Sequence, residues 1–409
     1  MKKDRKEKGN CPNLRFPEFT GEWEKKKLGE IVERVTRKNR NLETMLPLTI
    51  SAQYGLINQG SFFNKTIASA NLSHYYLLYK GEFAYNKSYS GDYPWGAIKR
   101  LDLYDKGALS TLYICFKPKD SKKSDFLMHY FESPKWHNEI SNIAGEGARN
   151  HGLLNIAVSN FFNTMHYVSK STDEQQKIAT FLSLIDERIK TQNKIIEQLE
   201  SLIRGLNNHL HEQYANDIEI SLAELGEFYN GLSGKSGDDF GSGKPYITYV
   251  NVYQNNIIDE SMIGYVKISN EEKQNTINYG DVLFTISSET PKEVGISSIY
   301  LGRSQGLYLN SFCFGYRLND FTILSPQYMA YCFSSYQFRK LVYPLAQGST
   351  RFNLHMSHFA NQKFKIPTVQ NQLKIQKLLD STSEKLQVEK LIHVSLKEQK
   401  SFFLKKLFI

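Results

Sequence analysis

Apolar residues recur in a regular pattern through the middle of the chain, between residues 173 and 210. The positions advance by alternating steps of four and three, and they are Ile178, Leu182, Ile185, Ile189, Gln192, Ile196, Leu199, Ile203, Leu206 and Leu210. Only Gln192 is polar. This narrow stripe is typical of a coiled-coil helix, which at about 1.5 Å per residue would be roughly 57 Å long. Ser171, Thr172 and Asp173 offer an N-cap. We therefore predict a long spacer helix over residues 171–215. An ordinary buried helix is the alternative.

A second apolar-rich stretch closes the chain, over residues 369–409. Its apolar positions include Leu378, Leu386, Ile392 and Leu396, which we predict to form the seam of a second long helix. This seam is less regular than the first, and a stutter or a broader buried face would explain that. Two striped helices of similar length are most economically packed on each other. If a pseudo-twofold axis relates the two halves of the chain, the helices run antiparallel.

The chain also matches itself at an offset of about 200 residues. Leu28-Gly29-Glu30 recurs as Leu225-Gly226-Glu227, and Gly81-Glu82 recurs as Gly280-Asp281. Other pairs, in the same order, are Ser110-Thr111-Leu112 with Asn310-Ser311-Phe312, Gly147-Ala148-Arg149 with Gly348-Ser349-Thr350-Arg351, and residues 174–178 with residues 371–375. We infer a basic tail over residues 1–15, a globular part over 16–170, the first helix over 171–215, a second globular part over 216–368 and the last helix over 369–409.

Each globular part mixes strand and helix signals, which predicts an α+β fold class. In the first part, strands are expected over residues 48–54, 81–86 and 111–116, and a helix over 126–140. In the second part, the corresponding strands are 246–252, 280–286 and 307–318, and the helix is 327–341. The segments between strands are polar and rich in Gly and Tyr, and such long loops often carry binding residues.

Composition and charge narrow the function only slightly. The chain has 409 residues with 51 Lys and Arg against 42 Asp and Glu, a net charge of +9, which is compatible with a polyanionic partner. The four cysteines form no Cys-x-x-Cys pair, so we expect neither a zinc site nor a disulfide framework. Residues 1–10 have no apolar core of a signal peptide, and no apolar run is long enough to span a membrane. The protein is expected to be soluble and cytoplasmic.

No catalytic motif stands out. Gly234-Lys235-Ser236 ends like a phosphate-binding loop but has Tyr229 at the position of the first Gly, and Gly243-Lys244 is followed by Pro245. Neither precedes a convincing helix, and no AdoMet-type catalytic motif follows the glycine-rich stretch. The sequence therefore favours binding or scaffolding over catalysis, with no metal site.

Several loops offer the groups that contact nucleic acid. The loop over residues 86–96 supplies amide, hydroxyl and aromatic groups, and basic residues follow it. A second basic cluster precedes the first strands, and two matched Gly-rich loops each carry an Arg. The candidate DNA-binding residues are Arg37, Lys38, Arg40, Asn86, Lys87, Ser88, Tyr89, Tyr93, Trp95, Lys99, Arg100, Arg149, Asn150, Lys235, Ser236, Lys244, Ser287, Ser288, Arg303, Ser349, Thr350 and Arg351. The alternative is that these are ordinary solvated loops.

The ordered set of these features resembles the specificity (S) subunits of type I restriction-modification systems over nearly the whole chain. The junctions carry the resemblance: Trp23-Glu24 with Leu28-Gly29-Glu30, residues 171–178, Ser287-Ser288-Glu289-Thr290-Pro291 through Gly295, Ser311-Phe312-Cys313 before Gly315-Tyr316-Arg317, and Gly348-Ser349-Thr350-Arg351 followed by Ile366-Pro367. The chain departs from the family pattern at Ser171, where the family usually has Pro, and at Asn371, where it has Glu.

The resemblance implies two target recognition domains, each reading one half of a bipartite, asymmetric site in double-stranded DNA. The two antiparallel helices would set the spacer between the half-sites and dock two modification subunits. AdoMet, ATP and Mg would belong to the modification and restriction subunits, and this chain would hold no cofactor and catalyse nothing. Two alternatives remain: a self-contained DNA methyltransferase or nuclease with an unrecognised site, and a coiled-coil assembly scaffold.

Overall fold

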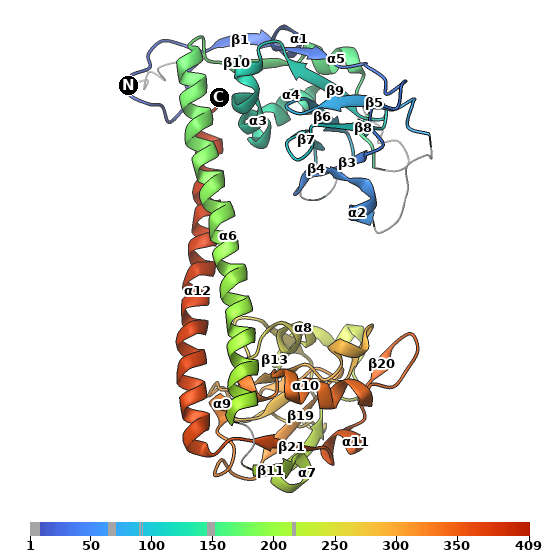
Figure 1. Cartoon of the computed structure of the whole chain (residues 1–409), viewed down its shortest axis with the longest axis vertical. Coiled ribbons are helices and arrows are strands. Elements are labelled where there is room, and N and C mark those ends of the chain that lie inside the picture. The colour runs from blue at the N-terminus through green and yellow to red at the C-terminus, as the bar shows by residue number, and fades with distance from the viewer. Residues whose placement is uncertain (1–8, 64–70, 90, 92, 145–151, 215–217) are drawn as a thin grey trace. The chain divides into compact units, whose positions relative to one another are not determined.

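The computed structural model describes residues 9–63, 71–89, 91, 93–144, 152–214 and 218–409. The chain divides into two compact units, each considered by itself. Unit 1 comprises Met1–Asn193 and Ile392–Ile409, and unit 2 comprises Lys194–Leu391. Each unit therefore contains one globular part and a segment of both long helices, which are α6 (Thr172–Tyr214) and α12 (Val369–Lys406) (Figure 1). Among the described residues, no helix is both long and apolar enough to cross a membrane.

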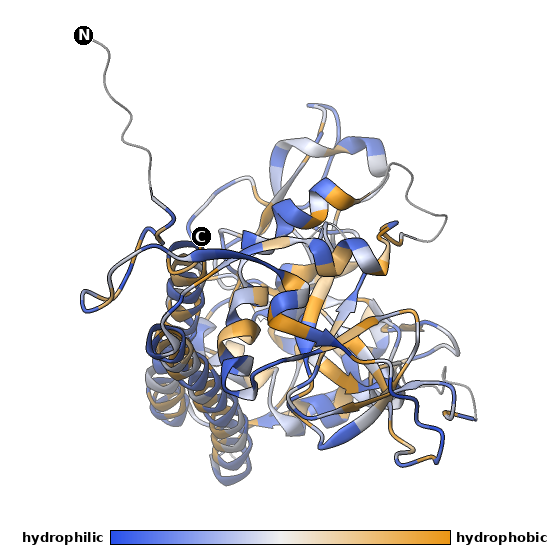
Figure 2. Ribbon diagram, turned by 90° about the horizontal axis from the view of Figure 1, so that it is seen from above, coloured by the Kyte–Doolittle hydropathy of each residue, from blue (hydrophilic) through white to orange (hydrophobic). Residues whose placement is uncertain are grey.

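Helix α6 begins where its sequence predicts. The Ser171 hydroxyl accepts a hydrogen bond from the Glu174 backbone N–H at 3.2 Å, which satisfies one of the free donors of the first turn. Every position of the predicted α6 seam is buried or half-buried, including Gln192. Figure 2 shows long helices that are mostly hydrophilic and globular parts whose inner strands are largely hydrophobic.

The seam of α12 differs from the predicted one. Leu378 and Ile392, which were predicted to lie in the seam, are 46% and 37% exposed. Leu386 and Leu396, and the residues spaced three or four positions from them along the same face of the helix, are buried or half-buried. These inward positions are Ile375, Leu379, Thr382, Leu386, Glu389, His393, Leu396, Lys400, Phe403 and Leu407. Their steps alternate four and three without a stutter. The seam is thus as regular as that of α6, but polar side chains hold several of its positions.

Within each unit the two helix segments run antiparallel, as expected. In unit 1 the rings of Phe181 and Phe403 lie 4.9 Å apart, and Lys400 pairs with Asp186 further along α6 at 2.5 Å. In unit 2 Glu200 pairs with Lys390 at 2.9 Å.

The globular part of unit 1 contains two four-stranded sheets and a two-stranded ladder, with sheet orders β2-β9-β6-β7 and β4-β3-β8-β5 and the pair β1-β10. The strands are β1 (Glu24–Lys27), β2 (Val32–Arg34), β3 (Pro47–Ser51), β4 (Gly55–Asn58), β5 (Tyr76–Tyr79), β6 (Phe83–Asn86), β7 (Ala97–Arg100), β8 (Lys106–Leu109), β9 (Ile114–Pro118) and β10 (Met165–Val168). The helices are α1 (Leu28–Ile31), α2 (Gln59–Phe63), η1 (Ser121–Lys123), α3 (Ser124–Glu132), η2 (Pro134–Trp136), α4 (His137–Ile143) and α5 (Val158–Asn163).

Unit 2 has sheet orders β12-β19-β15-β17 and β14-β13-β18 and the pairs β11-β21 and β16-β20. The strands are β11 (Ile218–Ser221), β12 (Gly226–Asn230), β13 (Phe240–Ile247), β14 (Ile263–Val266), β15 (Val282–Thr285), β16 (Ser287–Ser288), β17 (Ser297–Ile299), β18 (Tyr308–Leu309), β19 (Cys313–Leu318), β20 (Phe352–Asn353) and β21 (Lys363–Ile366). The helices are α7 (Leu222–Leu225), η3 (Gly237–Asp239), α8 (Tyr249–Gln254), η4 (Pro291–Glu293), α9 (Pro326–Cys332), α10 (Tyr336–Val342), η5 (Tyr343–Leu345) and α11 (Met356–Ala360).

The two globular parts share one topology, which confirms the internal repeat. The order β2-β9-β6-β7 of unit 1 corresponds strand for strand to β12-β19-β15-β17 of unit 2. The parallel pair β3–β8 corresponds to the parallel pair β13–β18, and the antiparallel ladder β1–β10 corresponds to β11–β21. The mixed α and β content confirms the expected fold class.

Two predicted helices and two predicted strands are divided or shortened in the structure. The strand expected over 307–318 becomes β18 and β19, which residues 310–312 separate. The helix expected over 126–140 breaks at Ser133-Pro134, because Pro cannot continue the hydrogen-bonded ladder. The helix expected over 327–341 is interrupted where the Ser335 hydroxyl accepts the Phe338 N–H and starts α10. The strand expected over 246–252 ends at Ile247, because the Thr248 hydroxyl accepts the Asn251 N–H and starts α8.

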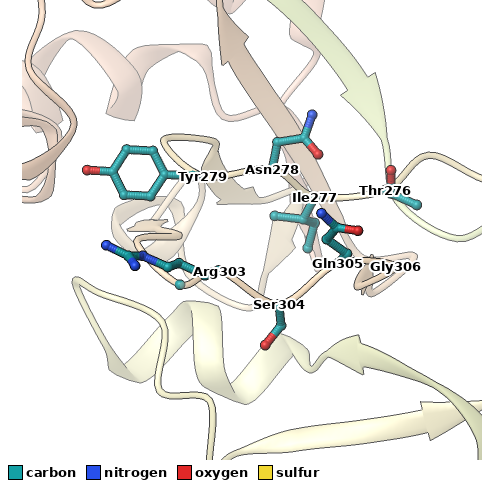
Figure 3. Close-up of a pocket in the computed structure, with 9 residues that line it drawn as sticks. Thr276, Ile277, Asn278, Tyr279, Arg303, Ser304, Gln305 and Gly306 are labelled. Atoms are coloured by element: carbon teal, nitrogen blue, oxygen red, sulfur yellow. The ribbon is translucent and has the colours of Figure 1, made fainter.

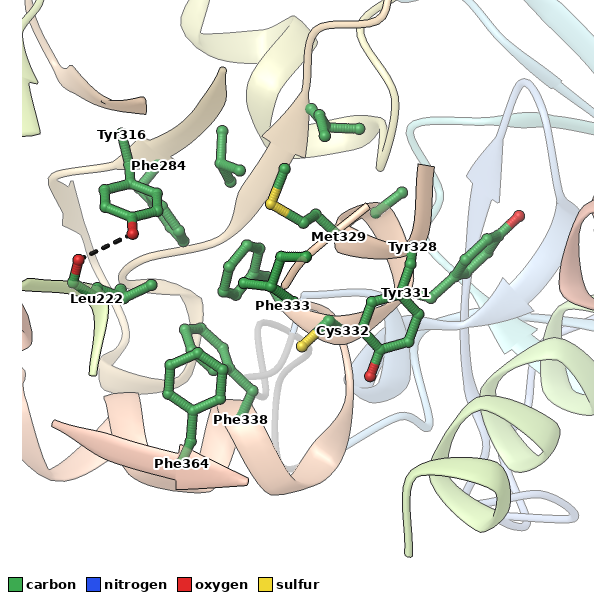
Figure 4. Packing of buried hydrophobic residues seen from close by; sticks show 14 of the residues in the cluster. Leu222, Phe284, Tyr316, Tyr328, Met329, Tyr331, Cys332, Phe333, Phe338 and Phe364 are labelled. Carbon is green, nitrogen blue, oxygen red and sulfur yellow. Dashed lines mark hydrogen bonds between the residues drawn. The ribbon is translucent and has the colours of Figure 1, made fainter. Parts of the chain in front are cut away.

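Aromatic residues dominate both cores. In unit 2 the cluster of Figure 4 joins β15, β19, α9, α10 and β21, and the Tyr316 hydroxyl donates to the Leu222 carbonyl oxygen at 2.8 Å. Phe284 and Phe314 stack across neighbouring strands at 5.3 Å. In unit 1 the stacked pair Phe83 and Phe116 has the equivalent position on β6 and β9, at 5.4 Å.

The junctions at which the long helices begin are also matched. The Gln175 side chain donates to the Ser169 carbonyl oxygen, and the Gln372 side chain donates to the Pro367 carbonyl oxygen. Glu174 is buried and accepts hydrogen bonds from Arg15 and from the Trp23 indole. Although burial favours the neutral acid, the Arg15 hydrogen bond holds the pKa of Glu174 below its ordinary value. Glu174 thus anchors the segment before β1.

Candidate nucleic-acid interface

An exposed hairpin of unit 2 carries three of the predicted contact residues. Gln347 and Asn353 exchange backbone hydrogen bonds of 2.9 and 2.8 Å and close the hairpin that leads into β20 (Figure 1). Gly348 has φ +137°, and a Cβ there would lie 2.0 Å from the Arg351 carbonyl oxygen, so the turn requires glycine. Ser349, Thr350 and Arg351 are all exposed at its tip. The hairpin therefore presents two hydroxyl groups and one guanidinium to a partner.

The predicted residues Ser287 and Ser288 lie at the base of this hairpin, where they pair with β20. They form β16, are both buried, and pair with Asn353 and Phe352 of β20. The Ser288 hydroxyl donates to Glu293 Oε2 at 2.8 Å. Their side chains are part of the base that holds the hairpin.

Aromatic side chains surround the same base. The rings of Tyr249 and Tyr253 on α8 stack at 6.0 Å, and the Tyr253 hydroxyl donates to Glu293 Oε1 at 2.9 Å. Hydrogen bonds from Ser288 and Tyr253 hold the pKa of Glu293 below its ordinary value, so this group is a carboxylate at neutral pH. The exposed ring of Phe312 lies 5.6 Å from the Arg351 guanidinium. We call Tyr249, Tyr253, Glu293, Phe312 and Arg351 the aromatic-acid cluster.

The aromatic-acid cluster has the chemistry of base readout. A guanidinium is suited to guanine edges or phosphates, and a carboxylate accepts from the cytosine amino group. Exposed aromatic faces pack on bases or thymine methyl groups. Only Arg351 of this cluster was predicted from the sequence. The match of Ser110-Thr111-Leu112 with Asn310-Ser311-Phe312 could have pointed to Phe312, but nothing in the sequence brings α8 or Glu293 to it.

The remaining candidates of unit 2 differ in their availability. Lys235 is buried against Glu272 at 2.5 Å, and this hydrogen bond lowers the pKa of Glu272 to about 2. Ser236 caps η3 through Asp239. Lys244 on β13 is exposed and, within the described part of the chain, makes no ion pair.

Arg303 lies apart from the hairpin, on the rim of an open pocket of about 690 Å³. Figure 3 shows this pocket between the segment carrying Asn278 and Tyr279 and the segment carrying Arg303 and Ser304. Most of its lining residues are exposed, although Ile277 is buried, and Arg303 makes no ion pair within the described part of the chain.

In unit 1 the predicted loop over residues 86–96 is closed by its own backbone. Gly96 has φ +74°, and a Cβ there would lie 2.1 Å from the Asn86 carbonyl oxygen. The Tyr85 hydroxyl donates to the Trp95 carbonyl oxygen, and the Asn86 side chain accepts from the Ser88 N–H. Ser88 and Tyr89 are exposed, Lys87, Tyr93 and Trp95 are half-buried, and Trp95 packs against the core.

Lys99 and Arg100 follow each other on β7 and so point to opposite faces of the sheet. Arg100 is fixed by Asp102 at 2.6 Å and by Asp125 at 2.7 Å, which ties β7 to the start of α3. Lys99 lines a pocket beside α12. The structure thus leaves Lys99, and not Arg100, available to a ligand.

The first basic cluster is largely engaged within unit 1. Arg37 pairs with Glu82 at 2.7 Å and lies over the Tyr79 ring, and Lys38 donates to the His74 carbonyl oxygen. Arg40 is exposed. The predicted residues Arg149 and Asn150 lie outside the described residues.

A charged network joins α3, α6 and α12 within unit 1. Lys400 pairs with Glu132 at 2.8 Å and with Asp186 at 2.5 Å, and His129 Nδ1 lies 3.5 Å from Glu132. Burial favours the neutral form of Glu132, but His129 and Lys400 lower its pKa to about 2. His129, Glu132 and Asp186 are close enough to share a metal ion. However, the Lys400 ammonium already occupies the space between the carboxylates, so this cluster is an ion-pair network.

Comparisons with known proteins agree with this architecture. The sequence family described as "Type I restriction modification DNA specificity domain" matches residues 218–398. No curated protein matches the chain in sequence. A similar solved structure is the S subunit of a type I restriction-modification system from M. genitalium, with a TM-score of 0.51, 18% identity, and coverage of 98% of this chain and 99% of that chain. Another comes from a study of complex assembly and conformational transition of the type I R-M system, with a TM-score of 0.58, 15% identity, and coverage of 94% and 97%.

Proposed function

We propose that the chain belongs to the specificity subunits of type I restriction-modification systems and that each of its globular parts reads one half of a bipartite, asymmetric DNA sequence. The observation that carries this proposal is the duplication. One strand order occurs in both units, which would give the chain two DNA-binding surfaces of the same design. Differences in the loops, such as the aromatic-acid cluster of unit 2, would let the two surfaces read different sequences.

The long helices would set the spacing of the half-sites and dock two modification subunits. The unbroken seams support a rigid connection, which a flexible linker would not supply. One of the similar structures comes from a study of complex assembly in such a system. AdoMet would be held by the modification subunits, and ATP and Mg by restriction subunits that join the complex. This division of labour places the protein with DNA in the cytoplasm.

The chain itself would catalyse no reaction. In the described network of unit 1, Lys400 forms ion pairs with both Glu132 and Asp186, so these carboxylates are engaged in packing. The thiols of Cys115, Cys313 and Cys332 are buried, and burial raises the pKa of Cys115 and Cys332 to about 12, so these thiols are not nucleophiles at neutral pH.

Transfer of labelled methyl groups from AdoMet to DNA tests this assignment. The chain alone, a type I modification subunit alone, and the two together would be incubated with DNA containing many sequences. Sequence-specific methylation is expected only from the mixture. Methylation by the chain alone would overturn the proposal in favour of a self-contained methyltransferase.

Exchange of one globular part tests the division into half-sites. Residues 218–366 would be replaced by the corresponding part of another specificity subunit, and the methylated sequence would be read again. One half-site should change while the other stays the same. Changes in both half-sites would contradict separate reading.

A further inference from the structure

The end of α12 forms one wall of a pocket in unit 1. The pocket has a volume of about 410 Å³ and lies between β7, the segment joining α3 to α4, and the last turns of α12. Its floor is apolar and contains the buried ring of Trp136. Its cationic groups are Lys99, Lys397, Lys400 and Lys405. One acid, Glu132, belongs to the lining.

The charges of this pocket do not cancel. Lys400 pairs with both Glu132 and Asp186, so its single positive charge balances only one of the two carboxylates. In the part of the chain that the structure describes, Lys99, Lys397 and Lys405 make no ion pair. Three ammonium groups therefore face an apolar floor against the one carboxylate charge that Lys400 leaves unbalanced.

Lys99 has the strongest requirement for an anion. It is half-buried, and burial holds the pKa of its ammonium below the ordinary value, opposed by Glu132 and Asp186 and helped by the charge of Lys400. An anion placed beside this group would restore the interaction that burial removes. Lys397 and Lys405 are exposed and lie two helical turns apart on α12, so both ammonium groups can turn toward one ligand.

The pocket is continuous with the predicted DNA-binding loop. Tyr93 and Gly96 of that loop belong to its lining, together with Lys99 of the strand that follows. A nucleic acid that contacts this loop would bring its backbone to the mouth of the pocket. Phosphate is the anion that such a partner carries at regular intervals.

We propose that this pocket seats a phosphate group of the DNA backbone, held by Lys99, Lys397 and Lys405, so that the end of the second long helix contributes directly to DNA binding. This inference rests on the proposed function. It assigns to α12 a role separate from spacing and from subunit docking. Because the contact is to phosphate, it adds affinity and register without reading bases.

Fluorescence anisotropy of a labelled duplex tests the proposal, using the complete complex of this chain with its modification subunits. The duplex would carry the sequence that the complex methylates, and Kd would be measured at several salt concentrations for the wild type and for K397A/K405A. Loss of one phosphate contact lowers the slope of log Kd against log salt by about 0.9 and raises Kd about fivefold at 0.15 M salt. The methylated sequence should stay the same.

Lys122 provides the matched control. It is an exposed lysine in η1, at the start of α3, whereas the pocket lies at the end of α3. K122A should leave Kd and the salt slope unchanged. An unchanged salt slope for K397A/K405A, in a complex that still binds its site, would overturn the inference and leave the proposed function intact. Failure of the wild-type complex to bind DNA would overturn both.

A free phosphate compound is the other source of the same chemistry. Titration of the complex with pyrophosphate in a calorimeter would detect it. Binding that disappears in K397A/K405A, combined with unchanged DNA affinity of that variant, would overturn the DNA assignment in favour of a small anion.

Discussion

Lys400 is the residue on which the packing of α3, α6 and α12 in unit 1 depends most clearly. Its ammonium bridges Glu132 and Asp186, two carboxylates from different elements. Lys400→Met keeps most of the length of the side chain and removes the charge. The two carboxylates then face each other without a cation, and repulsion should loosen the contact of α3 with the helix pair.

The pKa of Glu132 gives the size of the effect. Its value of about 2 lies below the ordinary 4.5, and at about 1.36 kcal/mol per pKa unit the difference corresponds to about 3.4 kcal/mol net, which is what the partners supply beyond the opposing cost of burial. His129 supplies part of this interaction. The side chains of Lys400 and Glu132 are 17% and 27% exposed, so solvent screens the pair further. We expect Lys400→Met to lower the free energy of unfolding by about 1–2 kcal/mol at pH 7.

The effect should depend on pH in a defined direction. The folded-state pKa of Glu132 lies below its unfolded value, so the stabilisation is fully present above pH 4.5 and is lost as pH falls toward 2. The difference in stability between wild type and variant should therefore shrink over that interval.

Urea unfolding of the full chain, followed by tryptophan fluorescence, measures the change in the stability of unit 1. All three tryptophans, Trp23, Trp95 and Trp136, belong to unit 1. A double-mutant cycle with Glu132→Gln isolates the coupling between the two side chains. Lys390→Met in unit 2, which breaks the more exposed pair with Glu200, should leave the tryptophan transition unchanged. Zero coupling, or a difference that persists unchanged at pH 3, would refute the reasoning.

Three further predictions follow from the seam, the hairpin and the helix length. Leu182 is fully buried, so Leu182→Ala should lower the stability of unit 1 by about 2–5 kcal/mol in the same urea assay, whereas Leu184→Ala, at a position that is 59% exposed, should change it by less than about 0.5 kcal/mol. Arg351→Ala should weaken the binding free energy of the complex for its DNA site by about 1–3 kcal/mol without changing thermal unfolding. An unchanged Kd would exclude the hairpin tip from the interface. Insertion of about four residues within 190–208 should lengthen the unspecified spacer of the methylated sequence and leave both half-sites unchanged. An unchanged spacer would argue that the helices do not determine the spacer length.

The sequence predicts α6 and its seam well because apolar side chains occupy almost every inward position. It predicts α12 as a helix but misplaces the seam, because Thr382, Glu389, His393 and Lys400 hold inward positions. Long polar side chains can cover apolar surface with their stems, and Lys400 finds carboxylates there. The internal repeat predicts the duplicated architecture because matched strings lie at equivalent places: Gly81-Glu82 and Gly280-Asp281 directly precede β6 and β15, and residues 174–178 and 371–375 lie in the first turns of α6 and α12.

Contact residues are harder to predict, because a charged residue is available only if nothing in the fold neutralises it. Arg37, Arg100 and Lys235 have the right chemistry, but Glu82, Asp125 and Glu272 engage them from distant points of the chain. Conversely, Lys397 and Lys405 lie on a helix that the pattern assigns to spacing. The pocket beside β7 is formed by tertiary packing, which no local pattern contains.

Sequencing of methylated bases in a genome is the most direct test of the central claim. Cells would express this chain with a type I modification subunit, and the control cells would express that subunit alone. We predict a new N6-methyladenine motif made of two short blocks separated by a gap of fixed length. Absence of any new motif, in cells where the two proteins demonstrably form a complex, would contradict the assignment of this chain as the subunit that selects the DNA sequence.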